Sequence, residues 1–265
     1  MSNVTCYPEV PRKGHLFSLL LLAATPVLAS DYVLEVSVVT DWETVTHYGS
    51  QAETSNKIST TIEYADVLFR NQLDLPIEVT YIDIPQTAND DVLAKHTHPE
   101  FLMDSLFEYR INNQQHMAAD VTVLLTSRKL STGGSNYVGY ANIQSVCSAG
   151  ALVIVSLYDS GLDGQTLAHE LAHVLGAVHD GEHPCEATPS RGYLMSTATH
   201  TGNDNLSQCS IDTIASTLEV FGSCLVAVEP EVIVTPPARS GGTGSTGMVF
   251  LGMLLIVCIV RRASA

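Results

Sequence analysis

Residues 169–180 contain the side chains with the clearest potential for chemistry in this chain. They read His-Glu-Leu-Ala-His-Val-Leu-Gly-Ala-Val-His-Asp. On a helix, His169 and His173 lie one turn apart and point the same way, so their imidazoles can bind one metal ion. Glu170 lies about 100° around the helix axis, where its carboxylate can reach the open side of that ion. The spacing therefore predicts a metal site with a carboxylate beside it.

His179 can complete this site only if the helix ends before it. On a continuous helix, His179 would lie about 9 Å beyond His173 along the axis, too far to share the ion. Gly176 can end the helix, because glycine adopts the left-handed backbone conformation at low cost and lets the chain turn back. Three neutral histidines leave one position on a zinc ion for water, which is typical of catalytic rather than structural zinc.

The alternative interpretation is an amphipathic core helix that happens to bury its histidines. The pattern fixes six residues, so the probability of a chance match is on the order of 10⁻⁸ per position. We therefore favour the metal site.

The elements that must position these residues follow from the apolar periodicity. Runs rich in β-branched residues predict strands, and apolar spacing near 3.6 residues predicts helices. Gly133 to Ser135 reads as a loop. Because strands and helices alternate, we expect an α/β fold with a mostly parallel twisted sheet and helices on both faces. The predicted strands cover residues 32–40, 75–84, 121–126, 138–145 and 151–157, and the predicted helices cover 50–71, 99–117, an active-site helix from about 164, and 210–220.

A second signal follows the third histidine. Met195 lies in a turn-prone stretch, Arg-Gly-Tyr-Leu-Met-Ser. A lone methionine usually packs in a core, but a methionine turn after such a helix belongs to the metzincin signature. The chain thus resembles the metzincin metallopeptidases, and Asp180, directly after the third histidine, makes it similar to their adamalysin (reprolysin) branch. The resemblance covers roughly residues 32–226.

The resemblance implies a fold, a cofactor and an activity. It implies a metzincin-like two-lobe catalytic domain, in which a larger upper lobe and a small C-terminal lobe enclose a substrate cleft. Zn²⁺ would be bound by His169, His173 and His179, and the substrates would be proteins or peptides. Glu170 would act as the general base that takes a proton from the attacking water.

Further residues of the cleft follow from the same resemblance. Segment 138–145 resembles the edge strand along which metzincin substrates lie extended, and residues 196–199 would form a wall of the S1′ pocket. Met195 would pack beneath the metal. Asp180 would orient the turn rather than bind the ion, because a fourth protein ligand would close the site.

Adamalysins often bind a structural calcium ion, and this chain matches only part of that site. The family uses a first-strand glutamate, an aspartate, and an asparagine after the last cysteine. Glu35 and Asp120 match the first two, but Ala227 stands at the third position. This departure argues against calcium.

The N-terminal segment is typical of a secretory signal peptide. Arg12 and Lys13 precede an uncharged apolar run over residues 16–28, and small residues precede a cleavage point before Ser30. We expect a signal peptide at 1–29 and the catalytic domain at 30–226. An uncleaved membrane anchor is the alternative.

The C-terminal segment reads as a linker followed by a sorting or anchor tail. Residues 227–247 are rich in Pro, Gly and Ser. Residues 248–265 contain an apolar segment that ends in an arginine pair, which would stay cytoplasmic. This tail resembles bacterial sorting tails of the Gly-Gly type; a glycolipid-anchor signal is the alternative. We expect an exported protein held at the membrane at least transiently through this tail, or released.

Charge and cysteine usage fit an exported protein. A net charge of −16 argues against nucleic acid as a partner, and we expect a monomer. Removal of both ends leaves four of the six cysteines, which reads as two disulfides with three pairings open. A structural zinc site is the alternative, but no C-x-x-C pair exists. The adamalysin resemblance implies that Cys147 pairs with Cys224 and Cys185 with Cys209.

Two weaker hypotheses remain. His96, His98 and His116 could form a second metal site, but surface histidines are usually solvated. The chain could also be a catalytically silent surface binding module with a metallopeptidase fold. Such a module would usually lose the glutamate or a ligand, and this chain retains all four.

Overall fold

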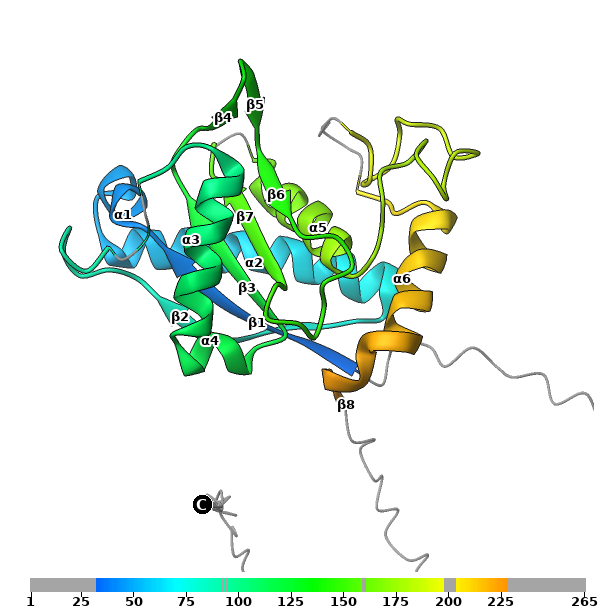
Figure 1. Ribbon diagram of the computed structural model, residues 1–265, viewed down its shortest axis with the longest axis horizontal. Coiled ribbons are helices and arrows are strands. Elements are labelled where there is room, and N and C mark those ends of the chain that lie inside the picture. Colours follow the sequence, from blue (N-terminus) through cyan, green and yellow to red (C-terminus); the bar gives the residue numbers. More distant parts are fainter. Residues whose placement is uncertain (1–31, 92, 94, 159–160, 198–203, 228–265) are drawn as a thin grey trace, which may run out of the picture. The chain divides into compact units, whose positions relative to one another are not determined.

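The computed structural model describes residues 32–227, apart from 92, 94, 159–160 and 198–203 (Figure 1). The predicted signal peptide, the tail at 248–265 and all but the first residue of the linker lie outside the described residues. Within the described ranges, no helix combines the length and apolar character needed to cross a membrane.

A mostly parallel sheet forms the centre of the described fold (Figure 1). Strands β2, β1, β3 and β7 run parallel to their neighbours, whereas the edge strand β6 runs antiparallel to β7. A short sixth strand, β8, pairs antiparallel with the start of β1. The α/β prediction is therefore confirmed. The strands in order across the sheet are β2 (Ile77–Asp83), β1 (Tyr32–Thr40), β3 (Val121–Thr126), β7 (Leu152–Ser156) and β6 (Gly139–Ala141), with β8 (Val226–Ala227) beside β1.

Helices cover both faces of this sheet, as predicted. On one face, α2 (Gln51–Leu73) and α5 (Asp163–Val174) pack in one hydrophobic cluster with Val123 and Val153. On the other face, α3 (Pro99–Ile111) packs with Leu124 and Ile154. Neighbouring residues of β3 and β7 thus point to opposite clusters, and every residue of both strands is buried.

Local capping explains where the helices begin and end. Ser50 accepts a hydrogen bond from the N–H of Glu53 at 3.1 Å and starts α2. The prediction of one continuous helix over 99–117 is wrong, because Asn113 caps a separate helix, α4 (Gln114–Ala118). Helix α1 (Trp42–Tyr48) was not predicted; the Asp41 side chain caps it by accepting from the N–H of Thr44 at 2.8 Å.

The predicted strand over 138–145 is shorter than expected. Only β6 pairs with β7, because Gln144 adopts a positive φ of 53° that ends the extended conformation. The N–H groups of Gln144 and Ser145 instead donate to the carbonyls of His173 and Val174, at 2.9 and 3.0 Å. The chain leaves the sheet here to satisfy the C-terminal end of α5.

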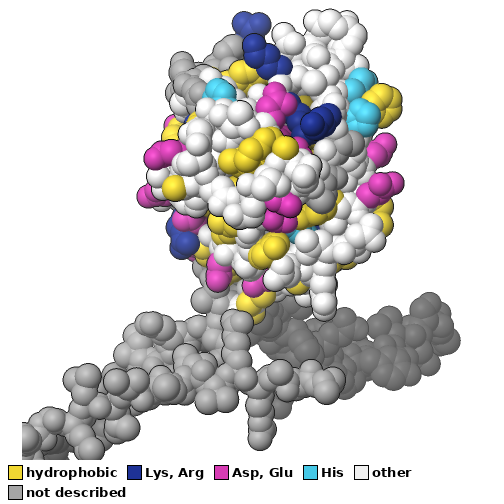
Figure 2. Space-filling view, turned by 90° about the vertical axis from the view of Figure 1, so that its left-hand side faces the viewer, with side chains coloured by type: hydrophobic (Ala, Val, Ile, Leu, Met, Phe, Trp, Pro, Cys, Tyr) yellow, Lys and Arg dark blue, Asp and Glu magenta, His cyan; other side chains and the backbone are white. Residues whose placement is uncertain are grey.

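A β-hairpin and a closing helix complete the described chain. Strands β4 (Leu130–Thr132) and β5 (Ser135–Tyr137) pair through a two-residue turn, Gly133-Gly134, with φ values of 56° and 88°. Ser135, expected in a loop, belongs to β5. Helix α6 (Gln208–Phe221) and a short 3₁₀ helix (Gly222–Cys224) follow the long segment after α5. On the face shown in Figure 2, acidic side chains are spread among apolar and neutral ones, in keeping with 28 acidic and 12 basic residues.

Candidate metal centre

Helix α5 presents the first two histidines from a buried position. It packs against α2 and the sheet, and all of its residues are buried. Gly164 allows α2 to approach, since a Cβ there would come closer than 3.0 Å to the side chain of Tyr64. His169 and His173 are therefore carried on a helix that is fixed on several sides.

Helix α5 ends just before Gly176, as the sequence predicted. Gly176 has a φ of 100°, and its N–H donates to the carbonyl of His173 at 2.9 Å. The N–H of Ala177 donates to the carbonyl of Ala172 at 2.9 Å. These two hydrogen bonds define a Schellman motif, in which glycine is the favoured residue. The chain then reverses toward the histidines of α5.

The reversal brings His179 to the other two histidines. The Nε2 atoms of His173 and His179 are 3.3 Å apart. One ligand atom from each of His169, His173 and His179 lies within 4.8 Å of the others, and this is the one such group of three among the described residues. Three ring nitrogens at this spacing could hold one metal ion.

The contacts of the Nδ1 atoms show which ring nitrogen of each histidine is left to bind a metal ion. The Nδ1 atoms of His169 and His173 lie 2.7 and 2.8 Å from the carbonyls of Leu194 and Ala177. A carbonyl only accepts, so each Nδ1 donates and each Nε2 keeps its lone pair. Burial lowers the pKa of His169 to about 4 and that of His173 to about 3. Both rings are thus neutral near pH 7, the state that binds a metal.

Glu170 lies beside the histidines on the wall of the same cleft. Its side chain is buried, and burial raises its pKa to about 8. The edge strand β6 passes directly over it: a Cβ on Gly139 would come closer than 3.0 Å to the Glu170 carboxylate. The sequence placed Gly139 in the predicted strand but did not predict this approach, although a glycine within a strand often marks a close backbone approach.

The cleft is large enough for several residues of a peptide. Its volume is about 1070 Å³. β6 forms one side of it and, as the last strand of the sheet, leaves backbone groups unpaired within the described residues. Part of the predicted 196–199 wall, Ser196 and Thr197, also lines the cleft. Residues that the sequence did not mark include Tyr137, Tyr158, Leu162 and Asp163.

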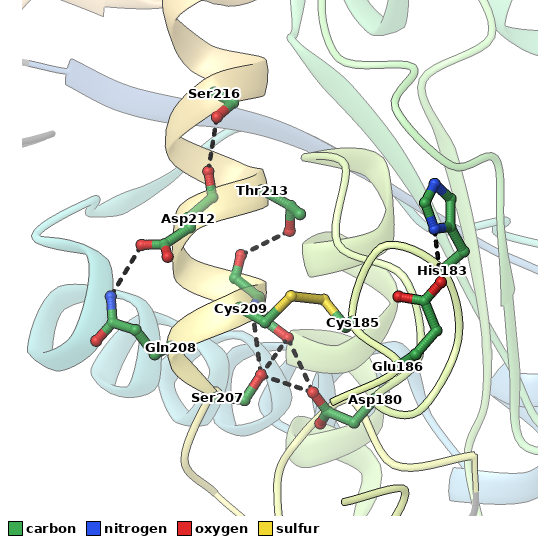
Figure 3. Close-up of a disulfide and its surroundings, with 11 residues drawn as sticks. Asp180, His183, Cys185, Glu186, Ser207, Gln208, Cys209, Asp212, Thr213 and Ser216 are labelled. Carbon is green, nitrogen blue, oxygen red and sulfur yellow. Dashed lines mark hydrogen bonds and ion pairs between the residues drawn. A yellow bond between two sulfur atoms is a disulfide. The ribbon is translucent and has the colours of Figure 1, made fainter. Parts of the chain in front are cut away.

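Met195 and Asp180 connect the segment after α5 to its surroundings. Met195 is fully buried in the main core, and its carbonyl accepts a hydrogen bond from the N–H of Asp180 at 2.9 Å. The Asp180 carboxylate is also fully buried and accepts from the hydroxyls of Ser207 and Ser210, at 2.6 and 3.4 Å (Figure 3). Asp180 therefore joins the loop of the third histidine to the start of α6.

Two disulfides hold the same region. Cys147 is bonded to Cys224, and Cys185 to Cys209, the pairing that the resemblance implied. The first joins the loop after β6 to the 3₁₀ helix that precedes β8. The second joins the loop after His179 to α6 (Figure 3). No described cysteine is left for a structural zinc site.

The structure also places the residues of the two weaker metal hypotheses, the calcium site and the second histidine site. Asp120 accepts from the backbone N–H of Glu35 at 2.8 Å, and burial raises its pKa to about 6. His116 was expected on the surface, but this prediction is wrong: it is fully buried, with Nδ1 2.9 Å from the Ser37 hydroxyl. Among the described residues, His96, His98 and His116 do not form a group of three ligand atoms close enough for one ion.

Comparison with known proteins agrees with this geometry. The chain is 26% identical over 212 residues to the venom metalloproteinase antarease-like TtrivMP_A of Tityus trivittatus, covering 67% of this chain and 53% of that protein. It is 27% identical over 146 residues to the venom metalloproteinase BumaMPs1 of Olivierus martensii, covering 48% and 37%. The chain thus spans about half the length, or less, of these two relatives.

A solved structure and a family model complete the comparison. A chain from "Structure of a chaperone-substrate complex" superposes with a TM-score of 0.54 at 12% identity, covering 74% of this chain and 35% of that one, which is a likeness of fold alone. The family model described as "Reprolysin (M12B) family zinc metalloprotease" matches residues 32–228. Because this match covers most of the chain and includes all three clustered histidines, the chain belongs to the reprolysin (M12B) family of zinc metalloproteases.

Proposed function

We propose that the chain is an exported zinc-dependent endopeptidase that hydrolyses peptide bonds in extended protein or peptide segments. The observation that carries this proposal is the convergence of three histidine side chains beside a buried glutamate, in a cleft bordered by a free strand edge.

The donor set suits zinc. His169, His173 and His179 would bind it through neutral imidazole nitrogens, and three such ligands are typical of catalytic zinc. When bound, zinc supplies polarisation of the scissile carbonyl and a lowered pKa of water. The backbone carbonyls that accept from Nδ1 of His169 and His173 hold both rings in the required tautomer.

Glu170 would carry the proton. Its carboxylate would accept a proton from the attacking water and deliver it to the nitrogen of the leaving amine. Its buried position supports this role, because exclusion of bulk water keeps the proton within the site and raises the pKa of the carboxyl group from 4.5 to about 8. A bound cation would lower that pKa again and favour the ionised base.

β6 would bind the substrate backbone. An extended peptide can add to the unpaired edge of a sheet through main-chain hydrogen bonds, which depend little on the peptide's sequence. This arrangement supports cleavage of unfolded or flexible segments rather than compact domains.

Met195 would form the floor of the metal site, and Asp180 would orient the turn that carries His179. The buried Met195 turn supplies the carbonyl of Leu194 to the first histidine, which supports its proposed place beneath the ion. The contacts of Asp180 with α6 support its proposed role in orienting the turn rather than in binding the metal.

Two disulfides and the venom metalloproteinase relatives support a place outside the cell. The proposal further includes a cleaved leader at 1–29 and transient or lasting membrane attachment through the tail at 248–265.

Cleavage of a denatured protein by the purified chain tests the proposal. We expect fragments in the presence of zinc, no fragments after treatment with a chelator, and none from Glu170→Gln at equal zinc content. Full cleavage by Glu170→Gln would refute the assigned base. Binding of the substrate without cleavage, at full zinc occupancy, would instead indicate the silent binding module.

A further inference from the structure

The third histidine, His179, differs from the other two in the partner of its Nδ1 atom. His169 and His173 each donate to a buried backbone carbonyl. The Nδ1 atom of His179 instead lies 3.4 Å from Oε1 of Glu182. The side chain of His179 is also 31% exposed, whereas the other two rings are buried. Packing therefore restrains the His179 ring less than the other two rings, and a side-chain partner contributes more to its orientation.

The backbone of the turn places Glu182 against His179. The N–H of Glu182 donates to the carbonyl of His179 at 3.1 Å, which closes a four-residue turn. Gly181 occupies its third position with a φ of 90°, a conformation that residues with a side chain rarely adopt. The turn thus returns the carboxylate to the ring three residues before it.

Contacts on both sides of the turn hold it in place. On one side, Asp180 binds the Ser207 hydroxyl at the start of α6. On the other, the N–H of Gly181 donates to the carbonyl of Cys185 at 3.1 Å, and Cys185 is bonded to Cys209 of α6. Glu182 therefore starts from an ordered backbone, which lowers the entropic cost of keeping its carboxylate at the ring.

A carboxylate at this position has a defined chemical effect. At 3.4 Å from Nδ1 it can accept the Nδ1–H of His179, and the neutral ring would then keep its Nε2 lone pair on the side of His173. A carboxylate partner also makes the imidazole a stronger donor to a metal and fixes its orientation.

We propose that Glu182 is the positioning residue of the third metal ligand and sets the zinc affinity of the site through His179. The inference rests on the proposed function, because it takes the three histidines to be the zinc ligands.

The chain offers a matched control one turn further on. His183 and Glu186 have the same spacing, and Nδ1 of His183 lies 2.6 Å from Oε1 of Glu186 (Figure 3). Both side chains are exposed, at 87% and 59%, and His183 does not belong to the histidine cluster. Glu186→Ala removes the same charge from the same loop without touching a ligand.

Zinc affinity, measured on the purified full chain by competition with a chromophoric chelator, tests the proposal. We expect Glu182→Ala to weaken zinc binding about 10- to 100-fold. Glu182→Gln keeps an acceptor oxygen, so we expect its zinc affinity to lie between those of Glu182→Ala and the unsubstituted chain. We expect the zinc affinity of Glu186→Ala to stay within about twofold of that of the unsubstituted chain. Glu182 is 58% exposed, so the apo-protein should unfold at the same temperature in all variants.

Imidazole ¹⁵N shifts of the metal-free protein provide a second readout. We expect His179 to be protonated on Nδ1, and Glu182→Ala to move it toward the Nε2–H tautomer. Unchanged zinc affinity in Glu182→Ala would overturn the proposal, as would an equal loss in Glu186→Ala, which would indicate a general charge effect. Absence of zinc binding in the unsubstituted chain would instead count against the proposed function.

Discussion

Gly176 lies so close to Thr217 of α6 that a Cβ on Gly176 would come closer than 3.0 Å to the threonine hydroxyl oxygen. The same glycine has a φ of 100°. The turn that leads to the third histidine thus requires glycine for two reasons, the backbone conformation and the space against α6.

Gly176→Ala should therefore lower both stability and zinc affinity. Gly192→Ala is the matched control, because Gly192 has a φ of 103° and nothing within 4 Å of its added Cβ. Strain alone costs about 1–2 kcal/mol in each variant. We expect Gly176→Ala to lose more free energy of unfolding than the control in urea titrations, and to weaken zinc binding, which Gly192→Ala should leave unchanged. Equal effects of both variants would show that the contact with Thr217 is unimportant.

Gly139→Ala should impair catalysis without removing the metal. The added methyl group would meet the Glu170 carboxylate and displace it, and a shift of about 1 Å can cost on the order of 10²-fold in rate. We expect kcat/KM to fall by about that factor while zinc content stays at one per chain. Gly150→Ala, whose Cβ would make only ordinary contacts from 3.5 Å, is the control. In a Glu170→Gln background the substitution should cause no further loss; an additional loss there would place its effect elsewhere.

Ser207→Ala should cost more than an ordinary helix cap. Ser207 caps α6 and also donates to the buried Asp180, which would lose its shorter hydrogen bond. Loss of a cap costs about 1 kcal/mol, and loss of a hydrogen bond to a buried charge about 1.5–3 kcal/mol more. Ser50→Ala, at the exposed cap of α2, should show only the first cost. Chemical denaturation of both variants measures the difference, and equal costs would exclude a contribution from Asp180.

Asp120→Asn should stabilise the protein in a pH-dependent way when calcium is absent. Burial raises the pKa of Asp120 from 3.8 to about 6, so the folded state binds the proton more tightly than the unfolded chain. The stability that Asp120 contributes is therefore present below pH 4 and lost as the pH rises to about 6. We expect a gain of about 1–3 kcal/mol for Asp120→Asn above pH 7 in chelator, shrinking toward pH 4. The opposite result would favour the calcium site: Asp120→Asn would lower stability at neutral pH, and added calcium would stabilise the unsubstituted chain.

The sequence predicted the elements best where one periodicity was uninterrupted. The bounds of β1 and β3 are those predicted, and α2 ends within two residues of its predicted end. The helix end at Gly176 could also be predicted, because glycine and the spacing of the histidines indicate the same reversal. These are features that local sequence determines.

Other features depend on tertiary contacts that no local pattern contains. The early end of β6 follows from the left-handed conformation of Gln144, a residue that does not usually adopt it, and from hydrogen bonds to α5. The burial of His116 depends on α4 packing beside Ser37 of β1. Glu182 was not singled out, because its contact with His179 depends on how the turn between them folds.

The zinc coordination of the purified chain tests the central claim most directly. X-ray absorption at the zinc edge gives the number and type of ligands, and imidazole nitrogens bind zinc at about 2.0–2.1 Å. We expect one zinc per chain with three imidazoles and one oxygen ligand, and two imidazoles with much weaker binding in His179→Ala. A site with two imidazoles in the unsubstituted chain, or one unchanged by His179→Ala, would contradict the account.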